Sequence, residues 1–112
     1  MLKLNVVARD VFFEVKTPLG VFIRTTKAYW KIITTIKHPS IAKHTREVKD
    51  ALRDPGQIRR SKQDPKVHLY YKNIGKLYVC VVADHINKDE GYIITAYLTD
   101  RIKEGEQIYV KN

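Results

Sequence analysis

The sequence predicts an α+β fold in which an N-terminal hairpin and two helices pack on one face of a four- to five-stranded antiparallel sheet. Helical spacing of apolar residues is confined to residues 27–52. After Asp54-Pro55-Gly56 the chain changes to short runs that are typical of strands and are separated by turn residues. The length of 112 residues fits a single domain, 1–112.

The N-terminal part predicts a hairpin followed by a helix. Residues 11–15 and 21–23 flank Thr17-Pro18-Leu19-Gly20, which is a turn signal. Thr25 or Thr26 can cap the helix that follows, because a side-chain hydroxyl accepts a hydrogen bond from a free backbone N–H of the first turn.

Two helices are predicted between residues 27 and 52. In residues 27–37 the apolar positions have helical spacing, and they are Tyr29, Trp30, Ile33 and Ile36. Pro39 ends this helix, because a proline pushes the residue before it out of the helical region. The second helix spans about residues 43–52 and should turn three apolar side chains toward the core: Val48, Ala51 and Leu52.

Four strands with short connections predict an antiparallel meander. They cover residues 57–61, 67–72, 77–84 and 92–99. Because residues 77–82 are apolar throughout, this strand should be central and buried on both faces. The charged tail carries a candidate edge strand at residues 108–110.

The last long strand should divide its side chains between two faces, because side chains alternate along a strand. The face toward the helices would carry Tyr92, Ile94, Ala96 and Leu98. The open face would carry Ile93, Thr95, Tyr97 and Thr99, which gives a row of hydroxyl donors at two-residue spacing. Threonine and tyrosine are also good strand formers, so strand propensity alone is an alternative explanation of this row.

The composition favours an anionic partner. The chain has 21 basic and 12 acidic residues, a net charge of +9, and the commonest polyanion is nucleic acid. No apolar run reaches the roughly 18 residues that a membrane-spanning helix needs, and the first ten residues do not resemble a signal peptide. Cys80, the single cysteine, lies in an apolar run and should be a buried, unreactive thiol. We therefore expect a cytoplasmic protein.

The stretch from residue 54 to residue 72 combines basic and aromatic side chains. Residues 59–76 include one acidic residue and six basic residues: Arg59, Arg60, Lys62, Lys66, Lys72 and Lys76. Guanidinium groups beside phenols and imidazoles suit phosphate and exposed bases. The alternative is a solvated hairpin edge that its charge keeps soluble. Arg59 and Arg60 must point to opposite faces of their strand, so only one of them can look into a given site.

The four histidines differ in what their positions predict. His38 leaves the end of the first helix, where the helix dipole favours a protonated imidazole, and it is a candidate proton-transfer group. The alternative role for it is a helix C-cap. His68 shares a strand face with Tyr70, whereas His44 should be half-buried on the second helix and His85 should be structural.

No motif for a metal or a phosphate loop is evident. The histidines are scattered, there is one cysteine, and the five glycines sit at turns. Neither helix has the pattern of a helix-turn-helix recognition element. We therefore expect no cofactor and no metal.

Several short motifs follow one another in a defined order. They are His38-Pro39, Leu52-Arg53-Asp54-Pro55, Ile58-Arg59-Arg60-Ser61, Tyr70-Tyr71, Tyr78-Val79-Cys80-Val81-Val82 and Thr95-Ala96-Tyr97-Leu98-Thr99-Asp100-Arg101-Ile102-Lys103-Glu104-Gly105. This order covers most of the chain and resembles the small prokaryotic and phage-associated members of the barnase–EndoU–colicin–RelE-like (BECR) ribonuclease superfamily. The resemblance implies that fold and a metal-independent endoribonuclease, often the toxin of a toxin–antitoxin pair, with RNA and an antitoxin protein as partners.

The resemblance also implies which residues form the site. The catalytic positions transfer to His38, Arg60, Thr95 and Tyr97, with Arg59 as the alternative arginine. The expected RNA-binding residues are Arg59, Ser61, Lys62, His68, Tyr70, Lys72 and Thr99. The chain departs from the barnase-type pattern because no glutamate is placed as an obvious general base. Glu47 falls on the second helix and Glu90 in a loop.

Under this hypothesis His38 transfers a proton, Arg60 or Arg59 holds the phosphate in a bidentate manner, and Tyr97 and Thr95 orient it. One alternative is a non-catalytic module whose sheet tyrosines stack on single-stranded bases. Another is a protein whose positive charge complements an acidic partner protein. The sequence predicts neither the RNA substrate nor the oligomeric state.

Overall fold

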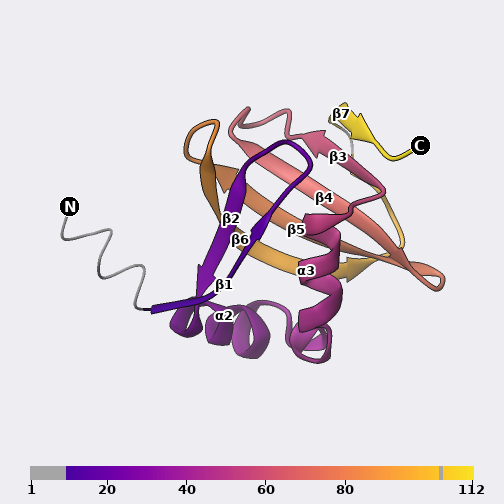
Figure 1. The fold of residues 1–112 in the computed structure, drawn as a ribbon. Coiled ribbons are helices and arrows are strands. Elements are labelled where there is room, and N and C mark those ends of the chain that lie inside the picture. The colour runs from indigo at the N-terminus through magenta and orange to yellow at the C-terminus, as the bar shows by residue number, and fades with distance from the viewer. Residues whose placement is uncertain (1–9, 104) are drawn as a thin grey trace.

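The computed structural model describes residues 10–103 and 105–112 and shows an α+β fold built on one mixed, seven-stranded sheet (Figure 1). The strands are β1 (Val11–Lys16), β2 (Phe22–Thr26), β3 (Gln57–Arg60), β4 (Val67–Ile74), β5 (Leu77–His85), β6 (Glu90–Thr99) and β7 (Glu106–Val110). Their order across the sheet is β1-β2-β6-β5-β4-β3-β7. The predicted meander is confirmed as β3 to β6, with β5 in the middle of the sheet.

The sheet has more strands than predicted because the hairpin and the tail both join it. β2 runs parallel to β6, with Phe22 opposite Glu90 and Arg24 opposite Tyr92. β7 pairs antiparallel with β3, which confirms the candidate edge strand in the tail. The expectation of a purely antiparallel sheet with the hairpin packed on its face is therefore wrong. The strands of these two pairs lie far apart in the sequence, so no local sequence pattern predicts that they pair.

The first predicted helix is present, but its winding changes halfway along. α2 (Lys27–Ile32) begins after Thr26, whose Oγ1 accepts a 3.1 Å hydrogen bond from the backbone N–H of Tyr29. The helix continues as η1 (Ile33–Lys37), which is π-helical. Two threonines in this stretch donate their hydroxyl protons to carbonyls of the preceding turn, and such bonds compete with the regular helical ladder.

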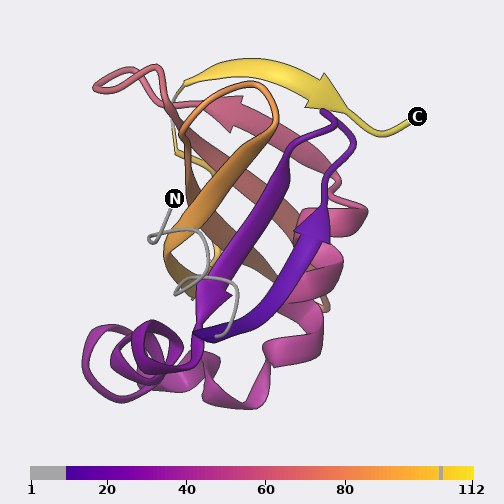
Figure 2. The same cartoon turned by 60° about the vertical axis from the view of Figure 1, so that its left-hand side comes forward.

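The chain turns sharply at His38 and then forms the second predicted helix. Pro39 opens a 3₁₀ turn, η2 (Pro39–Lys43), at a position where its missing N–H has no partner to lose. α3 (Thr45–Arg53) follows, and its three predicted core residues are fully buried: Val48, Ala51 and Leu52. Figure 2 shows the helical segment passing beneath one end of the strands before α3 rises along one face of the sheet.

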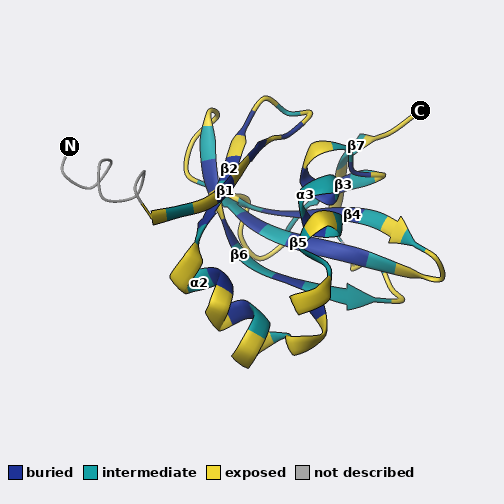
Figure 3. Ribbon diagram, turned by 60° about the horizontal axis from the view of Figure 1, so that its bottom comes forward, coloured by how far each residue is buried: buried dark blue, intermediate teal, exposed yellow. Residues whose placement is uncertain are grey.

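The main core lies between the helices and one face of the sheet. Its members include Ile23 from the hairpin, Trp30 and Ile33 from the first helical segment, and Val79 and Val81 from β5. Figure 3 shows these buried positions concentrated on the central strands and on the inner sides of the helices. A core of this kind fixes the relative positions of the helices and the sheet through burial of apolar surface.

The sheet face opposite the helices, which we call the open face, carries a second and smaller cluster. Cys80 packs there with Leu69 and Tyr71, and Ile102 from the loop between β6 and β7 packs against them. β5 is therefore buried on both faces, as predicted. Burial raises the pKa of the Cys80 thiol to about 11, which agrees with the expectation of a buried, unreactive cysteine.

A β-bulge in β6 changes which of its side chains face the core. The register slips where Val82 pairs with Thr95 and Ala83 with Ile93, so that Ile94 is the extra residue. Ile93 is consequently buried in the main core, whereas Tyr92 is 43% exposed. The predicted alternation is correct from Thr95 onward and wrong at Tyr92, Ile93 and Ile94, because it assumed an unbroken strand.

Candidate active site

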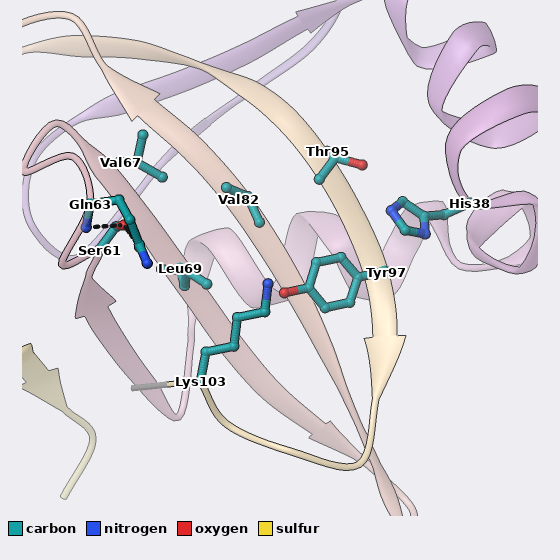
Figure 4. A pocket seen from close by; sticks show the side chains of 9 residues that line it. All are labelled: His38, Ser61, Gln63, Val67, Leu69, Val82, Thr95, Tyr97 and Lys103. Atoms are coloured by element: carbon teal, nitrogen blue, oxygen red, sulfur yellow. Dashed lines mark hydrogen bonds between the residues drawn. The ribbon is translucent and has the colours of Figure 1, made fainter. Parts of the chain in front are cut away.

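The open face contains a pocket of about 510 Å³ at the end of the sheet near η1 (Figure 4). Its lining residues are His38, Ser61, Gln63, Val67, Leu69, Val82, Thr95, Tyr97 and Lys103. They come from four segments of the chain: the end of η1, the β3–β4 connection with β4, the central strands, and the loop after β6. Four residues predicted from the sequence meet here, namely His38, Ser61, Thr95 and Tyr97.

The strands supply a floor that is apolar and an edge that carries hydroxyls. Leu69 of β4 and Val82 of β5 are cross-strand partners and form part of the floor. Thr95 and Tyr97 stand two residues apart on β6, after the bulge, so both point to the open face. A pocket with an apolar base and a few convergent polar groups is typical of a ligand site.

His38 reaches the pocket because the helical segment ends beside β6. Its backbone N–H, and not its imidazole, donates to the carbonyl of Ile33 at a distance of 2.8 Å. The ring is therefore not used to cap the helix, and it lies 5.2 Å from the ring of Tyr97, centroid to centroid, at an interplanar angle of 44°. This geometry leaves the imidazole oriented toward the pocket in contact with the phenol (Figure 4).

Lys103 adds a positive charge that the sequence-based analysis did not include in the site. Its backbone N–H donates a 3.0 Å hydrogen bond to the hydroxyl of Tyr71, which holds the loop after β6 against the open face. The Nζ atom lies 5.7 Å from the centroid of the Tyr97 ring, and Figure 4 shows the two side chains extending toward each other. Only the apolar Ile102, set between charged residues, hinted that this loop returns to the sheet.

Tyr97 is held in its neutral form. Burial is the main cause that raises the pKa of its phenol well above the ordinary value, and the neighbouring Cys80 thiol adds to it. A phenol in this state donates a proton in a hydrogen bond but does not act as a base. Among the described residues, neither the buried Tyr97 hydroxyl nor the buried Thr95 hydroxyl has a hydrogen-bond partner. Buried polar atoms without a partner are uncommon, and both of these belong to residues that line the pocket.

Ser61 and Gln63 form the opposite rim of the pocket. The Ser61 hydroxyl donates to the Gln63 side-chain oxygen at 3.1 Å and accepts from the Gln63 backbone N–H at 3.2 Å. These two bonds fix a polar rim across the floor from His38 and Tyr97 (Figure 4). Gln63 was not among the predicted site residues, because its position in a basic turn carries no signal of its own.

Neither arginine of β3 lines the pocket, which corrects the prediction for Arg60. Arg60 pairs across the sheet with His68 on the helix side, and its guanidinium binds Glu106 at 2.9 Å. Arg59 lies on the open face, where it donates to Gln57 and, at 2.9 Å, to the backbone carbonyl of Gly105. The two arginines point to opposite faces of β3, as expected. Each one binds a residue at or next to β7, Arg59 the Gly105 carbonyl and Arg60 the Glu106 carboxylate.

Four further residues that were predicted to bind RNA lie away from the pocket. Tyr70 is fully buried in the main core, and His68 is only 6% exposed, so neither offers its ring to a base. Lys72 binds the Asp54 carboxylate at 3.2 Å beneath the end of α3. The Thr99 hydroxyl bonds to the backbone of Arg101 at the end of β6.

Lys62 and the two glutamates also lie outside the set of lining residues. Lys62 is exposed in the β3–β4 connection. On α3, Oε1 of Glu47 lies 3.4 Å from Nδ1 of His44, the half-buried residue that precedes the helix. Glu90 opens β6, and does not lie in a loop as expected, and it forms an ion pair with Arg24 at 2.9 Å. None of the described residues that line the pocket is a carboxylate.

The fold and the pocket define a small α+β protein with a mixed sheet and a histidine-, tyrosine- and lysine-lined site on its open face. Comparisons of the chain with protein-family models, with curated proteins and with solved structures find no match. Among residues 10–103 and 105–112, no three potential ligands are close enough to hold a metal ion. No helix in these ranges has both the length and the apolarity to cross a membrane.

Proposed function

We propose that the protein is an endoribonuclease that works without a metal ion and cleaves RNA by attack of the 2′-hydroxyl on the adjacent phosphate. The observation that carries the proposal is the convergence of His38, Thr95, Tyr97 and Lys103 on one pocket of about 510 Å³. These residues supply an imidazole, two hydroxyls and an ammonium group. The net charge of +9 favours a polyanionic substrate.

The reaction moves two protons and places negative charge on the phosphate. In the proposal His38 takes the proton from the 2′-hydroxyl as general base, and solvent water gives a proton to the departing 5′-oxygen. Negative charge accumulates on the phosphate, and Lys103 is the cation nearest to this chemistry. Tyr97 remains a neutral phenol, so its part is to donate a hydrogen bond to a phosphate oxygen, next to Thr95.

The floor of the pocket supports a nucleotide as the occupant. Val67, Leu69 and Val82 provide an apolar surface for the flat face of a base, while the polar rim of Ser61 and Gln63 can reach the hydrogen-bonding edge of that base. Lys103 takes the place that was expected for Arg60 as the phosphate-binding cation. An acidic antitoxin that neutralises the basic surface remains part of the proposal.

Incubation of the purified protein with total RNA in the presence of EDTA tests the proposal. We expect cleavage, and we expect His38→Ala to lower its rate by about 10²- to 10⁴-fold, the usual contribution of one acid–base group. Lys103→Met should also lower the rate, whereas the matched control Lys88→Met, in the β5–β6 turn, should not. If Arg60→Ala loses as much activity as His38→Ala, the assignment of the phosphate to Lys103 is wrong.

A non-catalytic RNA-binding module is the second candidate, because no described lining residue is a carboxylate that could serve as a general base. This candidate predicts that RNA stays intact and is retained by the protein in a salt-dependent manner. Intact RNA without retention would contradict both candidates.

A further inference from the structure

A second pocket, of about 240 Å³, lies farther along β6, where β2 joins the sheet and α2 begins. It is lined by Arg24, Thr25, Thr26, Tyr29, Tyr92 and Ile93. The proposed cleavage chemistry uses none of these residues. The pocket is therefore free to serve a different purpose, and its position next to the first pocket limits what that purpose can be.

The β-bulge at Ile94 brings the two pockets to the same face of the sheet. In an unbroken strand Tyr92 and Thr95 would point to opposite faces, because their positions differ by three and side chains alternate with each residue. The extra residue restores them to one face, where Tyr92 pairs with Asp84 and Thr95 pairs with Val82. Three residues of strand span about 10 Å, so neighbouring nucleotides of one RNA strand can reach both pockets.

The second pocket suits a base better than a phosphate. Tyr92 is 43% exposed, and its hydroxyl is fixed by a 3.2 Å hydrogen bond to the Asp84 carboxylate. Arg24 is paired with Glu90 at 2.9 Å, so two carboxylates offset the single guanidinium. Among the described residues, Glu90 accepts from one of the five guanidinium N–H donors of Arg24. A pocket without excess positive charge, but with a fixed aromatic ring and such donors, favours stacking and edge recognition of a base.

Lys37 lies between the two pockets. Its Nζ donates to the Tyr29 hydroxyl at 2.9 Å and to the Ile94 carbonyl at 3.3 Å, and it precedes His38 in the chain. A lysine ammonium has three donors, so one remains for a ligand when these two bonds are formed. The cation therefore lies at the junction where a phosphate would link one nucleotide to the next.

We propose that the Tyr92 pocket is a second nucleotide subsite, which binds the base of single-stranded RNA next to the nucleotide in the His38 pocket, with Lys37 at the linking phosphate. This inference rests on the proposed function. It makes the substrate a single strand, because paired bases cannot stack on Tyr92.

Fluorescence anisotropy with 5′-labelled pentaadenylate tests the subsite, in a His38→Ala background that keeps the RNA intact. We expect Tyr92→Leu to weaken binding about five- to tenfold, which is the lower range for loss of one stacked base. Tyr92→Phe keeps the ring and should bind like the parent protein. Phe12→Leu, which removes a ring of similar exposure (40%) from β1, is the matched control. Thermal unfolding of each variant establishes that it is folded.

The outcomes distinguish a failure of the subsite alone from a failure of the function on which it rests. Binding by the parent protein with weaker binding by Tyr92→Leu alone supports the subsite. If Tyr92→Leu binds as tightly as the parent protein, the subsite is wrong while the RNA-directed function stands. If Tyr92→Phe binds as weakly as Tyr92→Leu, stacking is not what the residue provides, and the subsite is also wrong. If the parent protein does not bind pentaadenylate, the proposed function and the subsite both fall.

Discussion

His68, which was expected to bind RNA, and His85, which ends β5, stack on each other. The His68 and His85 rings lie 3.6 Å apart, centroid to centroid, at an interplanar angle of 8°. The Tyr70 hydroxyl and Nε2 of His85 share a 2.8 Å hydrogen bond, and Nδ1 of His68 donates to the Lys66 carbonyl at 3.0 Å. Both imidazoles thus fill structural roles in their neutral forms, as the sequence predicted for His85 only.

Stability should fall in acid because of this stack. Burial lowers the pKa of both histidines, to about 4 for His85, where His68 and then Arg60 add to the effect. For His68, Arg60 acts in the same direction, whereas the Lys66 carbonyl and Asp84 oppose it. Between pH 6.5 and pH 4 the His85 imidazole is protonated in the unfolded chain but stays neutral in the folded protein. The stabilisation is therefore present above pH 6.5 and is lost toward pH 4, by about 2–3 kcal/mol.

Urea denaturation at pH 7.5 and pH 4.5 measures this loss. His85→Asn removes the titrating group and should reduce the difference in unfolding free energy between the two pH values. The control His44→Asn removes an imidazole outside the stack and should leave most of the difference. An undiminished difference in His85→Asn would show that other groups cause the acid sensitivity.

At the scale of elements, the bulge in β6 and the π-helical η1 act together to position the candidate site. The Tyr29 hydroxyl donates to the Ile94 carbonyl at 2.6 Å, which connects α2 to the extra residue of the bulge. Bulges and π-helical turns leave backbone groups without their usual partners and recur at functional sites. Here the carbonyl freed by the bulge is the one that anchors the helical segment that ends at His38.

Loss of this anchor should cost stability. Tyr29→Phe removes a part-buried hydrogen bond and leaves the Ile94 carbonyl without its phenol donor, so the free energy of unfolding should fall by about 1 kcal/mol. Chemical denaturation measures the change. Tyr109→Phe, which removes a phenol hydroxyl on edge strand β7, is the control and should change stability less. Equal losses in both variants would mean that the Tyr29 bond has no special structural role.

The extent to which elements could be predicted depended on whether their signals were local. The helices, the Thr26 cap and the β3–β6 meander follow from spacing, capping and turn residues that lie within a few positions. The parallel pairing of β2 with β6 and the bulge at Ile94 do not. The parallel pairing and the bulge both depend on which strand lies next to β6 in the folded protein. The residues of β6 alternate regularly in the sequence, so the sequence does not reveal the change of register at the bulge.

At the scale of the molecule, the proposed function predicts that the charge of +9 dominates the affinity for RNA. Binding to a single strand releases counterions, so the affinity should fall log-linearly with salt, by about tenfold between 50 and 200 mM. Anisotropy of labelled single-stranded RNA across this range measures the slope, and unfolding temperatures at the same salt concentrations control for changes in the fold. An affinity that does not depend on salt would contradict a phosphate-directed interaction.

The candidate site could be predicted only in part, because some of its residues are placed by local sequence signals and others by contacts between distant segments. His38, Thr95 and Tyr97 lie at the end of a helix and on a regular stretch of strand, where local rules place them correctly. Arg60 was misplaced because the sequence does not reveal which face of β3 is open. Lys103 was missed because a loop that folds back over a sheet depends on the shape of that sheet.

The parallel contact between β2 and β6 also bears on the order in which the chain assembles. Strands β3 to β6 are consecutive in the sequence, so they can pair after only short loops close. Phe22 can pair with Glu90 only after a long loop closes. His38 lies in the segment that connects these two parts, so the pocket is completed last. In pulse-labelled hydrogen exchange during refolding, the amide of Val81 should gain protection before that of Phe22, and the proposed ribonuclease activity should return with the later step.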